Sequence, residues 1–233
     1  TTLYTLLAEK NNPETNIITV EDPVEIKIPG LNQVQVNAKA GMTFASGLRS
    51  ILRQDPDIIL VGEIRDGETA EIAMRAAITG HLVFSTIHTN DAVSSINRLI
   101  DMGLEPYMVS SALVGVVSQR LVRRICTNCR KPYDPDDYER EKLNLEPGQK
   151  IYKGEGCTDC NGSGYKGRIA IHEIVVISKG MKSLLEKRAS EDDMRQLAVK
   201  EGTQMLADSA AALVLEGITT LPELNRVAYS IDG

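Results

Sequence analysis

The sequence has few aromatic residues: of 233 residues none is Trp, two are Phe and seven are Tyr. Proteins that bind single-stranded nucleic acid usually stack the bases on aromatic side chains. The net charge of −6 likewise provides no general attraction to nucleic acid or to anionic lipid. We therefore expect a function other than nucleic-acid binding.

Long apolar runs are also missing. A helix that crosses a bilayer needs about 20 consecutive apolar residues, and no stretch of the chain approaches that length. The first residues show no secretory signal-peptide pattern. Hydrophobic residues make up 42% of the chain and charged residues 25%, a composition typical of globular proteins. These observations predict a cytoplasmic protein with no direct membrane insertion.

Cysteine is limited to four residues, which form two C-x2-C pairs separated by 27 residues: Cys126 and Cys129, then Cys157 and Cys160. Two such pairs supply four thiolates for a closed tetrahedral Zn²⁺ site. The separation exceeds the roughly 15–20 residues of the commonest pattern. Disulfides or redox pairs are the alternative, which a reducing compartment disfavours. Because a closed site has no place for water, we expect a structural zinc that stabilises a small insert.

Strands and helices alternate through the first half of the chain. Apolar runs predict strands at 16–20, 58–61 and 82–84, and helical spacing predicts helices at 1–10, 43–53, 68–78, 96–100 and 108–121. This alternation predicts an α/β fold with a parallel sheet. The sequence divides into four predicted parts: an α/β core at 1–125, the cysteine insert at 126–165, a strand returning to the core sheet at 166–178, and a helical subdomain at 179–233.

Acidic residues follow two of the predicted strands. The first strand is followed by Glu21, Asp22 and Glu25, and the second by Gly62, Glu63, Arg65 and Asp66. Ligands bind beyond the carboxyl ends of parallel strands, and carboxylates there can hold a hydrated Mg²⁺. Solvated turns are the alternative explanation. A third strand supports the site hypothesis, because His81 and His88 lie at its two ends; one of them can equally be a core histidine.

Three segments resemble the ATPases that power type II secretion and type IV pilus assembly. Thr19–Glu25 is similar to their Asp box, Ile51–Asp66 to their Walker B region, and Thr79–Asp91 to their His box. With the cysteine pairs, the resemblance covers nearly the whole chain in the family's order. It implies a RecA-like P-loop NTPase fold. Secretion and assembly members carry the cysteine insert, whereas pilus-retraction ATPases lack it.

The resemblance also implies roles for individual residues. Glu63 matches the Walker B acid that acts on Mg²⁺ through water, and Gly62 stands where many other P-loop enzymes have an Asp. Glu21 matches the catalytic base, with Glu25 as the alternate. His81 and His88 match residues that line the ATP site near the next subunit, and Asp22 and Arg65 lie in the same motifs. The implied assembly is a homo-hexamer that binds inner-membrane platform proteins of the pilus or secretion machine.

The family's phosphate-binding loop, G-x-x-x-x-G-K-S/T, runs directly into a segment like Thr1–Tyr4. We therefore expect that loop just before residue 1, and a chain that does not hydrolyse ATP by itself. Two alternatives to an ATPase are a zinc-containing nucleic-acid module, suggested by basic residues around the first cysteine pair, and a partner-docking module. The basic residues are Arg120, Arg123, Arg124, Arg130 and Lys131.

Overall fold

The computed structural model describes residues 2–229, which form two compact units. The first comprises residues up to 89, 94–114 and 177–194, and the second comprises 90–93, 115–176 and the residues from 195 onward. The elements of the first unit are α1 (Thr2–Lys10), β1 (Ile17–Glu21), β2 (Asn32–Gln35), the 3-10 helix η1 (Ala38–Ala40), α2 (Phe44–Ile51), β3 (Ile58–Val61), α3 (Gly67–Ile78), β4 (Leu82–Ser85), most of α4 (Ala92–Asp101), α5 (Pro106–Ala112), α7 (Lys179–Glu186) and the start of α8 (Glu191–Lys200).

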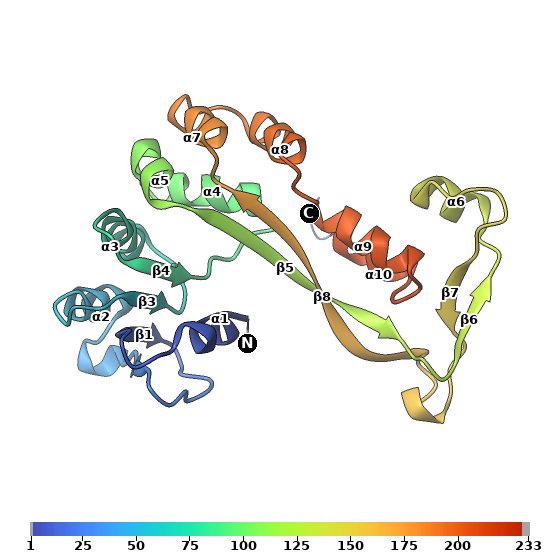
Figure 1. Cartoon of the computed structure of the whole chain (residues 1–233), viewed down its shortest axis with the longest axis horizontal. Helices are drawn as coiled ribbons and strands as arrows, with labels where there is room; N and C mark the ends of the chain where they lie inside the picture. Colours follow the sequence, from blue (N-terminus) through green and yellow to red (C-terminus); the bar gives the residue numbers. More distant parts are fainter. Residues whose placement is uncertain (1, 230–233) are drawn as a thin grey trace. The chain divides into compact units, whose positions relative to one another are not determined.

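A four-stranded parallel sheet in the order β2-β1-β3-β4 forms the centre of this unit. Every residue of β1 and β3 is buried, as expected for strands with both faces covered. On one face, Leu7 of α1 packs against Ile17, Ile58 and Leu60. On the other, α2 approaches β1 so closely that a Cβ on Gly47 would lie 3.0 Å from the Val20 side chain. Figure 1 shows α2 and α3 beside the sheet. The predicted α/β fold is confirmed.

Local signals set the helix starts. Thr43 accepts from the Ser46 backbone N–H, and Ser46 accepts from the Thr43 N–H, so the two residues form a capping box that starts α2. Asp66 caps α3 in the same manner by accepting from the Thr69 N–H at 2.8 Å. The predicted helix starts near residues 43 and 68 are confirmed within one residue.

The second unit is built on a two-stranded antiparallel ribbon of β5 and β8, in which Gly115 pairs with Val176 and Val122 with Ile169. Its elements are β5 (Gly115–Ile125), β6 (Arg130–Tyr133), α6 (Asp137–Leu143), β7 (Ile151–Gly154), the 3-10 helix η2 (Thr158–Cys160), β8 (Tyr165–Val176), α9 (Leu206–Leu215) and α10 (Leu221–Tyr229). A second antiparallel pair, β6 and β7, lies in the cysteine segment.

Two predictions about the ribbon are wrong. Residues 115–121 were expected to be helical, but α5 ends at Ala112 and β5 follows. The β-branched Val114, Val116 and Val117 favour the strand once β8 supplies a partner. The strand predicted at 166–178 exists as β8, yet it pairs with β5 and does not return to the four-stranded sheet.

The cysteine segment shares its core with the C-terminal helices. Leu143 of α6 and Ile151 of β7 are buried in one cluster with Leu206, Val214 and Leu221. A segment this small cannot bury enough apolar surface alone. The structure therefore unites the insert with α9 and α10, whereas α7 belongs to the other unit.

One buried carboxylate of the second unit binds the first residues of two helices. Glu173 of β8 is fully buried and accepts from the backbone N–H of Ala92 at 3.0 Å and of Leu206 at 3.2 Å. These N–H groups open α4 and α9, where no intrahelical acceptor exists. Burial raises the pKa of Glu173. The two helix starts are thus tied to β8 through one side chain.

Candidate functional site

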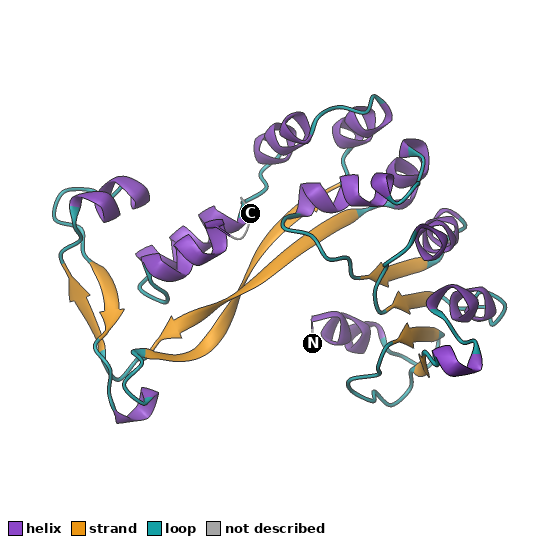
Figure 2. Cartoon of the chain, turned by 180° about the vertical axis from the view of Figure 1, so that it is seen from behind, coloured by secondary structure: helices purple, strands orange, loops and turns teal. Residues whose placement is uncertain are grey.

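The ends of three parallel strands bring the predicted acidic residues to one edge of the sheet. Val20 of β1 is paired with Val61 of β3, which in turn is paired with Ser85 of β4. Glu21, Glu63 and His88 therefore follow their strands at the same edge, toward which the arrows point in Figure 2. The sequence prediction of this convergence agrees with the geometry.

Glu63 forms the centre of this edge. Its carboxylate makes an ion pair with Arg65, and its Oε2 lies 3.6 Å from Nε2 of His88. The Glu63 side chain is 13% exposed, whereas that of His88 is 90% exposed. Hydrogen bonding to Glu63 raises the pKa of Arg65, and the nearby charge of Asp22 adds to the effect. A partly exposed carboxylate with these two partners can bind a hydrated cation.

Glu21 is held differently. Only 4% of it is exposed. Its carboxylate accepts from the Tyr4 hydroxyl, from Thr19 Oγ1 at 2.5 Å and from Gln33 Nε2 at 3.2 Å. Thr19 and Glu21 share a face because strand side chains alternate, and Gln33 is the register partner of Thr19. These three donors occupy most of the acceptor positions of the Glu21 carboxylate.

Glu25 and Asp22 are exposed by comparison. The segment that carries them is fixed through its backbone: the Glu25 N–H donates to Tyr4 Oη at 3.1 Å and the Val24 N–H donates to Gln35 Oε1 at 3.3 Å. Asp22 and Arg65 line a cavity of about 310 Å³ beside the first turns of α2 and α3. The Glu25 side chain is thus exposed to solvent, while its backbone N–H is held by the Tyr4 hydroxyl.

Gly62 allows β1 and β3 to approach closely at this edge. A Cβ on Gly62 would lie 3.2 Å from the Cα of Glu21. The Gly62 N–H donates to Val20 O at 2.8 Å, and its carbonyl accepts from Thr86 Oγ1 at 2.7 Å. A carboxylate side chain at position 62 would therefore press on the backbone of β1.

His81 is not part of this cluster within one chain. It precedes β4 at the opposite end of the strand, where its Nδ1 lies 3.0 Å from the carbonyl oxygen of Ala76 at the end of α3. The structure places His88, but not His81, beside Glu63. Sequence reasoning also missed Tyr4, Thr19 and Gln33, which hold the Asp-box segment; only the two-residue spacing of Thr19 and Glu21 on a strand could have indicated one of these contacts.

The four cysteines form a second candidate site. Their Sγ atoms all lie within 4.8 Å of one another, and Cys126–Cys157, Cys129–Cys160 and Cys157–Cys160 are separated by 3.8, 3.8 and 3.7 Å. A tetrahedron with Zn–S bonds of about 2.3 Å has edges of about 3.8 Å. A disulfide needs about 2.05 Å, so none is formed. The geometry fits one Zn²⁺ with four sulfur ligands.

Backbone N–H groups around Cys160 stabilise the thiolate form of its side chain. Burial alone would raise the pKa of this thiol, but the N–H groups of Cys157 and Gly164 point to its sulfur at 3.2 and 3.3 Å and lower the pKa to about 6. By contrast, burial raises the pKa of Cys129 to about 12. A metal that binds all four sulfurs would displace the Cys129 proton, so the metal affinity of the site should depend on pH.

The basic residues around the first cysteine pair are mostly engaged within the chain. Arg123 pairs with the buried Glu223 at 2.8 Å and stacks over Tyr165. Arg130 stacks over Tyr152, and Lys131 pairs with Glu155 at 2.6 Å. Three of the five basic residues that suggested phosphate binding are therefore bound within the chain.

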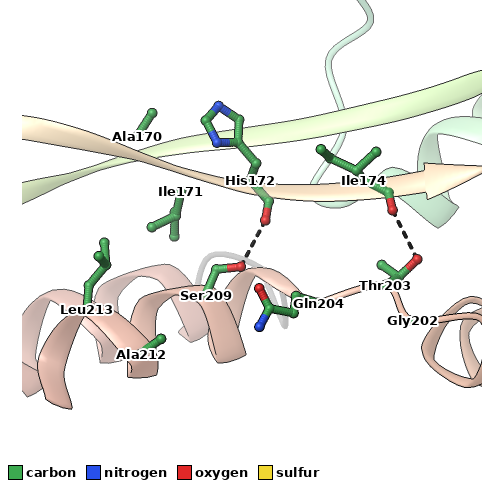
Figure 3. A pocket seen from close by; sticks show the side chains of 10 residues that line it. All are labelled: Ala170, Ile171, His172, Ile174, Gly202, Thr203, Gln204, Ser209, Ala212 and Leu213. Carbon is green, nitrogen blue, oxygen red and sulfur yellow. Dashed lines mark hydrogen bonds between the residues drawn. The ribbon is translucent and has the colours of Figure 1, made fainter. Parts of the chain in front are cut away.

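A cavity of about 510 Å³ lies along the edge of β8 that faces away from β5. There Ser209 Oγ donates to the His172 carbonyl at 2.9 Å and Thr203 Oγ1 to the Ile174 carbonyl at 3.0 Å (Figure 3). The hydroxyls satisfy strand-edge carbonyls, a common protection of an exposed edge. The cavity contains no cluster of acids, bases or metal ligands.

Within residues 2–229, no helix has the length and apolar character needed to cross a membrane.

Comparison with known proteins gives consistent matches. Residues 1–226 match the protein family described as "Type II/IV secretion system protein". The chain is 49% identical to the type II secretion system protein E of Pseudomonas aeruginosa over 97% of its length, and 49% identical to the type IV pilus assembly ATPase PilB of Thermus thermophilus over 96%. It spans 45% and 26% of those two proteins.

Solved structures support the same fold. The pilus retraction motor PilT, determined with bound ADP, superposes with a TM-score of 0.71 at 28% identity, covering 97% of this chain and 57% of that one. The ATPase DotB of Legionella pneumophila gives a TM-score of 0.68 at 20% identity, over 98% of this chain and 56% of that one. The second likeness concerns the fold alone.

Proposed function

Because this chain belongs to the family of type II/IV secretion system proteins, we propose that it is the hydrolytic part of an ATPase motor that powers type II secretion or type IV pilus assembly. The observation that supports this most is the convergence of Glu63 and His88 with the Asp-box segment at the carboxyl edge of one parallel sheet. Relatives named as secretion and pilus-assembly ATPases share nearly half of its residues.

In this proposal Glu63 holds Mg²⁺ through water, and a glutamate of the Asp-box segment orients the attacking water. The sequence favoured Glu21 as that base. The structure supports Glu25 instead, because Glu21 is buried under three donors whereas Glu25 is exposed. A general base needs a free lone pair within reach of the water. Glu21 then fixes the segment, and Glu25 performs the proton transfer.

Binding of the triphosphate requires a phosphate-binding loop in addition to these carboxylates. The 233-residue sequence contains no G-x-x-x-x-G-K-S/T motif, and P-loop enzymes bind phosphates through that loop and its Lys. The edge described above carries Glu21, Asp22, Glu25 and Glu63, whose charges repel phosphate. These carboxylates are suitable ligands for Mg²⁺. They cannot bind the triphosphate of ATP unless other groups supply hydrogen-bond donors. We therefore propose that the chain alone does not hydrolyse ATP.

The cysteine site is proposed to hold one structural Zn²⁺. Four sulfurs occupy all four positions of a tetrahedral ion, so no position remains for a reacting water. The ion joins the turn at Cys126–Cys129 to that at Cys157–Cys160, and thereby closes the segment that carries β6, α6 and β7. Its contribution is to stability.

The working assembly is proposed to be a homo-hexamer in the cytoplasm, peripheral to the inner membrane through platform proteins of the secretion or pilus machine. The exposure of His88 supports a role for this side chain at a site completed by a neighbouring subunit. His81 can reach such a site only from another subunit, because it lies at the far end of β4.

The proposal is tested with Glu63→Gln in the full-length ATPase that carries this chain. Nucleotide binding should persist and phosphate release should fall at least about 100-fold, because the amide cannot hold the Mg²⁺ water shell. Glu71→Gln is the matched control, since Glu71 is an exposed α3 residue paired with Arg75. Equal turnover in Glu63→Gln and wild type would contradict the proposed function.

A further inference from the structure

Tyr4 connects the two glutamates of the Asp-box segment through one hydroxyl. Its Oη donates to a carboxylate oxygen of Glu21 and accepts the backbone N–H of Glu25 at 3.1 Å. A phenol has a single hydrogen to donate, and an ionised carboxylate can only accept. The two contacts are therefore directional: the hydrogen points to Glu21 and a lone pair faces Glu25.

The position of the hydroxyl is set by the packing of α1. Leu7 is fully buried against Ile17 and Ile58, and Leu3 packs on the same cluster. Ile17, Thr19 and Glu21 share one face of β1 because their spacing is two. Tyr4 lies one turn from Leu7 on this helix, so anchoring Leu7 on Ile17 directs the Tyr4 side chain toward the end of β1.

The hydroxyl keeps its hydrogen across the neutral range. Burial raises the pKa of Tyr4, and the hydrogen bond to Glu21 raises it further. Two other side chains fix the same segment from β2: Gln35 accepts from the Val24 N–H, and Gln33 accepts from the Ile28 N–H at 2.8 Å. Among the hydrogen bonds given above for residues 2–229, the one to the Glu25 N–H comes from Tyr4.

We infer that Tyr4 is a positioning residue for catalysis: its hydroxyl uses the buried carboxylate of Glu21 as a fixed anchor and places the backbone of Glu25, and with it the catalytic carboxylate. This inference rests on the proposed function and extends it to a residue outside the Asp-box, Walker B and His-box segments. It assigns distinct tasks to the two glutamates, with Tyr4 as the link between them.

The test compares Tyr4→Phe with wild type in the full-length ATPase. Phe preserves the ring and removes only the hydroxyl, so Glu21 loses one donor and the Glu25 N–H loses its acceptor. Amide hydrogen exchange in residues 22–28 should be about fivefold faster, as for the loss of one hydrogen bond. The kcat for ATP should fall by about tenfold or more with KM within about twofold, because misplaced catalytic groups mainly lower the chemical step.

Tyr107→Phe is the matched control, since Tyr107 is 60% exposed on α5. Unchanged exchange in residues 22–28, or an unchanged kcat, in Tyr4→Phe would overturn the inference. A Glu25→Gln variant separates this failure from a wrong assignment of the base, and Glu63→Gln separates both from a failure of the proposed function. If Glu25→Gln abolishes turnover and Tyr4→Phe does not alter it, only the role of Tyr4 is wrong. If Glu25→Gln itself retains full turnover, the assignment of the base fails first, and the positioning role of Tyr4 fails with it.

Discussion

Replacing Cys157 by Ser should release the zinc and loosen one defined part of the molecule. Structural zinc sites contribute about 10–16 kcal/mol of apparent binding free energy at neutral pH. The intact protein should therefore retain about one Zn²⁺ per chain through dialysis. In Cys157→Ser one corner of the sulfur tetrahedron is lost, and with it the connection between the two turns.

The size of the effect on folding follows from the shared core. Leu143 and Ile151 are the buried residues of the cysteine segment that pack against α9 and α10. Exposing a buried Leu or Ile costs about 1.5–3 kcal/mol each. If the segment detaches on zinc loss, the second unit should lose about 3–6 kcal/mol of stability. The core of the parallel sheet, around Leu7, Ile17 and Ile58, contains no residue of the segment, so it should be unaffected.

The assay combines elemental analysis with amide hydrogen exchange. In Cys157→Ser, exchange should accelerate across residues 126–165 and in α9 and α10, while β1, β3 and β4 keep their protection. Thr158→Ser is the control, because it alters the same turn without removing a sulfur. A metal-free wild-type preparation with unchanged exchange in residues 126–165 would refute the reasoning, as would disulfides within the two pairs.

The further predictions concern four glutamates. In the full-length ATPase proposed to carry this chain, Glu25→Gln should lower steady-state phosphate release about 10²–10⁴-fold, as for loss of a general base. Glu21→Gln should lower the thermal midpoint of unfolding, because an amide cannot accept from all three donors. For Glu223, burial raises the pKa, but the backbone N–H and guanidinium of Arg123 outweigh this effect and lower the pKa below its ordinary 4.5. The ionised carboxylate therefore adds to the free energy of unfolding above pH 4.5, and this contribution is lost as the pH falls through the folded-state pKa. The free energies of unfolding of wild type and Glu223→Gln, measured in urea, should converge under acid. Glu173→Gln should cost about 1–3 kcal/mol in the same unfolding assay, because its single acceptor cannot serve the first N–H groups of both α4 and α9. An unfolding difference for Glu223→Gln that persists below the folded-state pKa, or a Glu173→Gln variant as stable as wild type, would contradict these two assignments.

Features determined by neighbouring residues could be predicted from the sequence. Ile58–Val61 reads as a continuous apolar run, and β3 has those bounds. Thr43 has the side chain of a helix cap, and it caps α2. The spacing within each cysteine pair brings two sulfurs into one turn, and the cluster forms as expected. In each case the physical cause lies within a few residues of its effect.

Contacts between distant residues could not be predicted in this way. Residues 115–121 have apolar spacing compatible with a helix, and the choice of a strand depends on β8, whose paired residues lie 49 to 61 positions later. The carboxylate of Glu173 accepts from a residue 81 positions away. No local pattern marks Glu173 as buried, because its neighbours on β8 alternate as they would in any half-exposed strand.

The two strand-end glutamates show why a motif predicts a site more reliably than it predicts roles. Glu21 ends β1 and Glu63 follows β3, and both carboxylates stand at the same edge of the sheet. Glu21 lies on the face covered by α1, where Tyr4 donates to it, whereas Glu63 follows Gly62 beyond the end of β3 and keeps 13% of its side chain exposed. Their chemistry differs because of the helix that packs over one of them. Tyr4, 17 positions upstream of Glu21, thus occupies one acceptor position of that carboxylate, and this contact depends on the anchoring of Leu7 in the core.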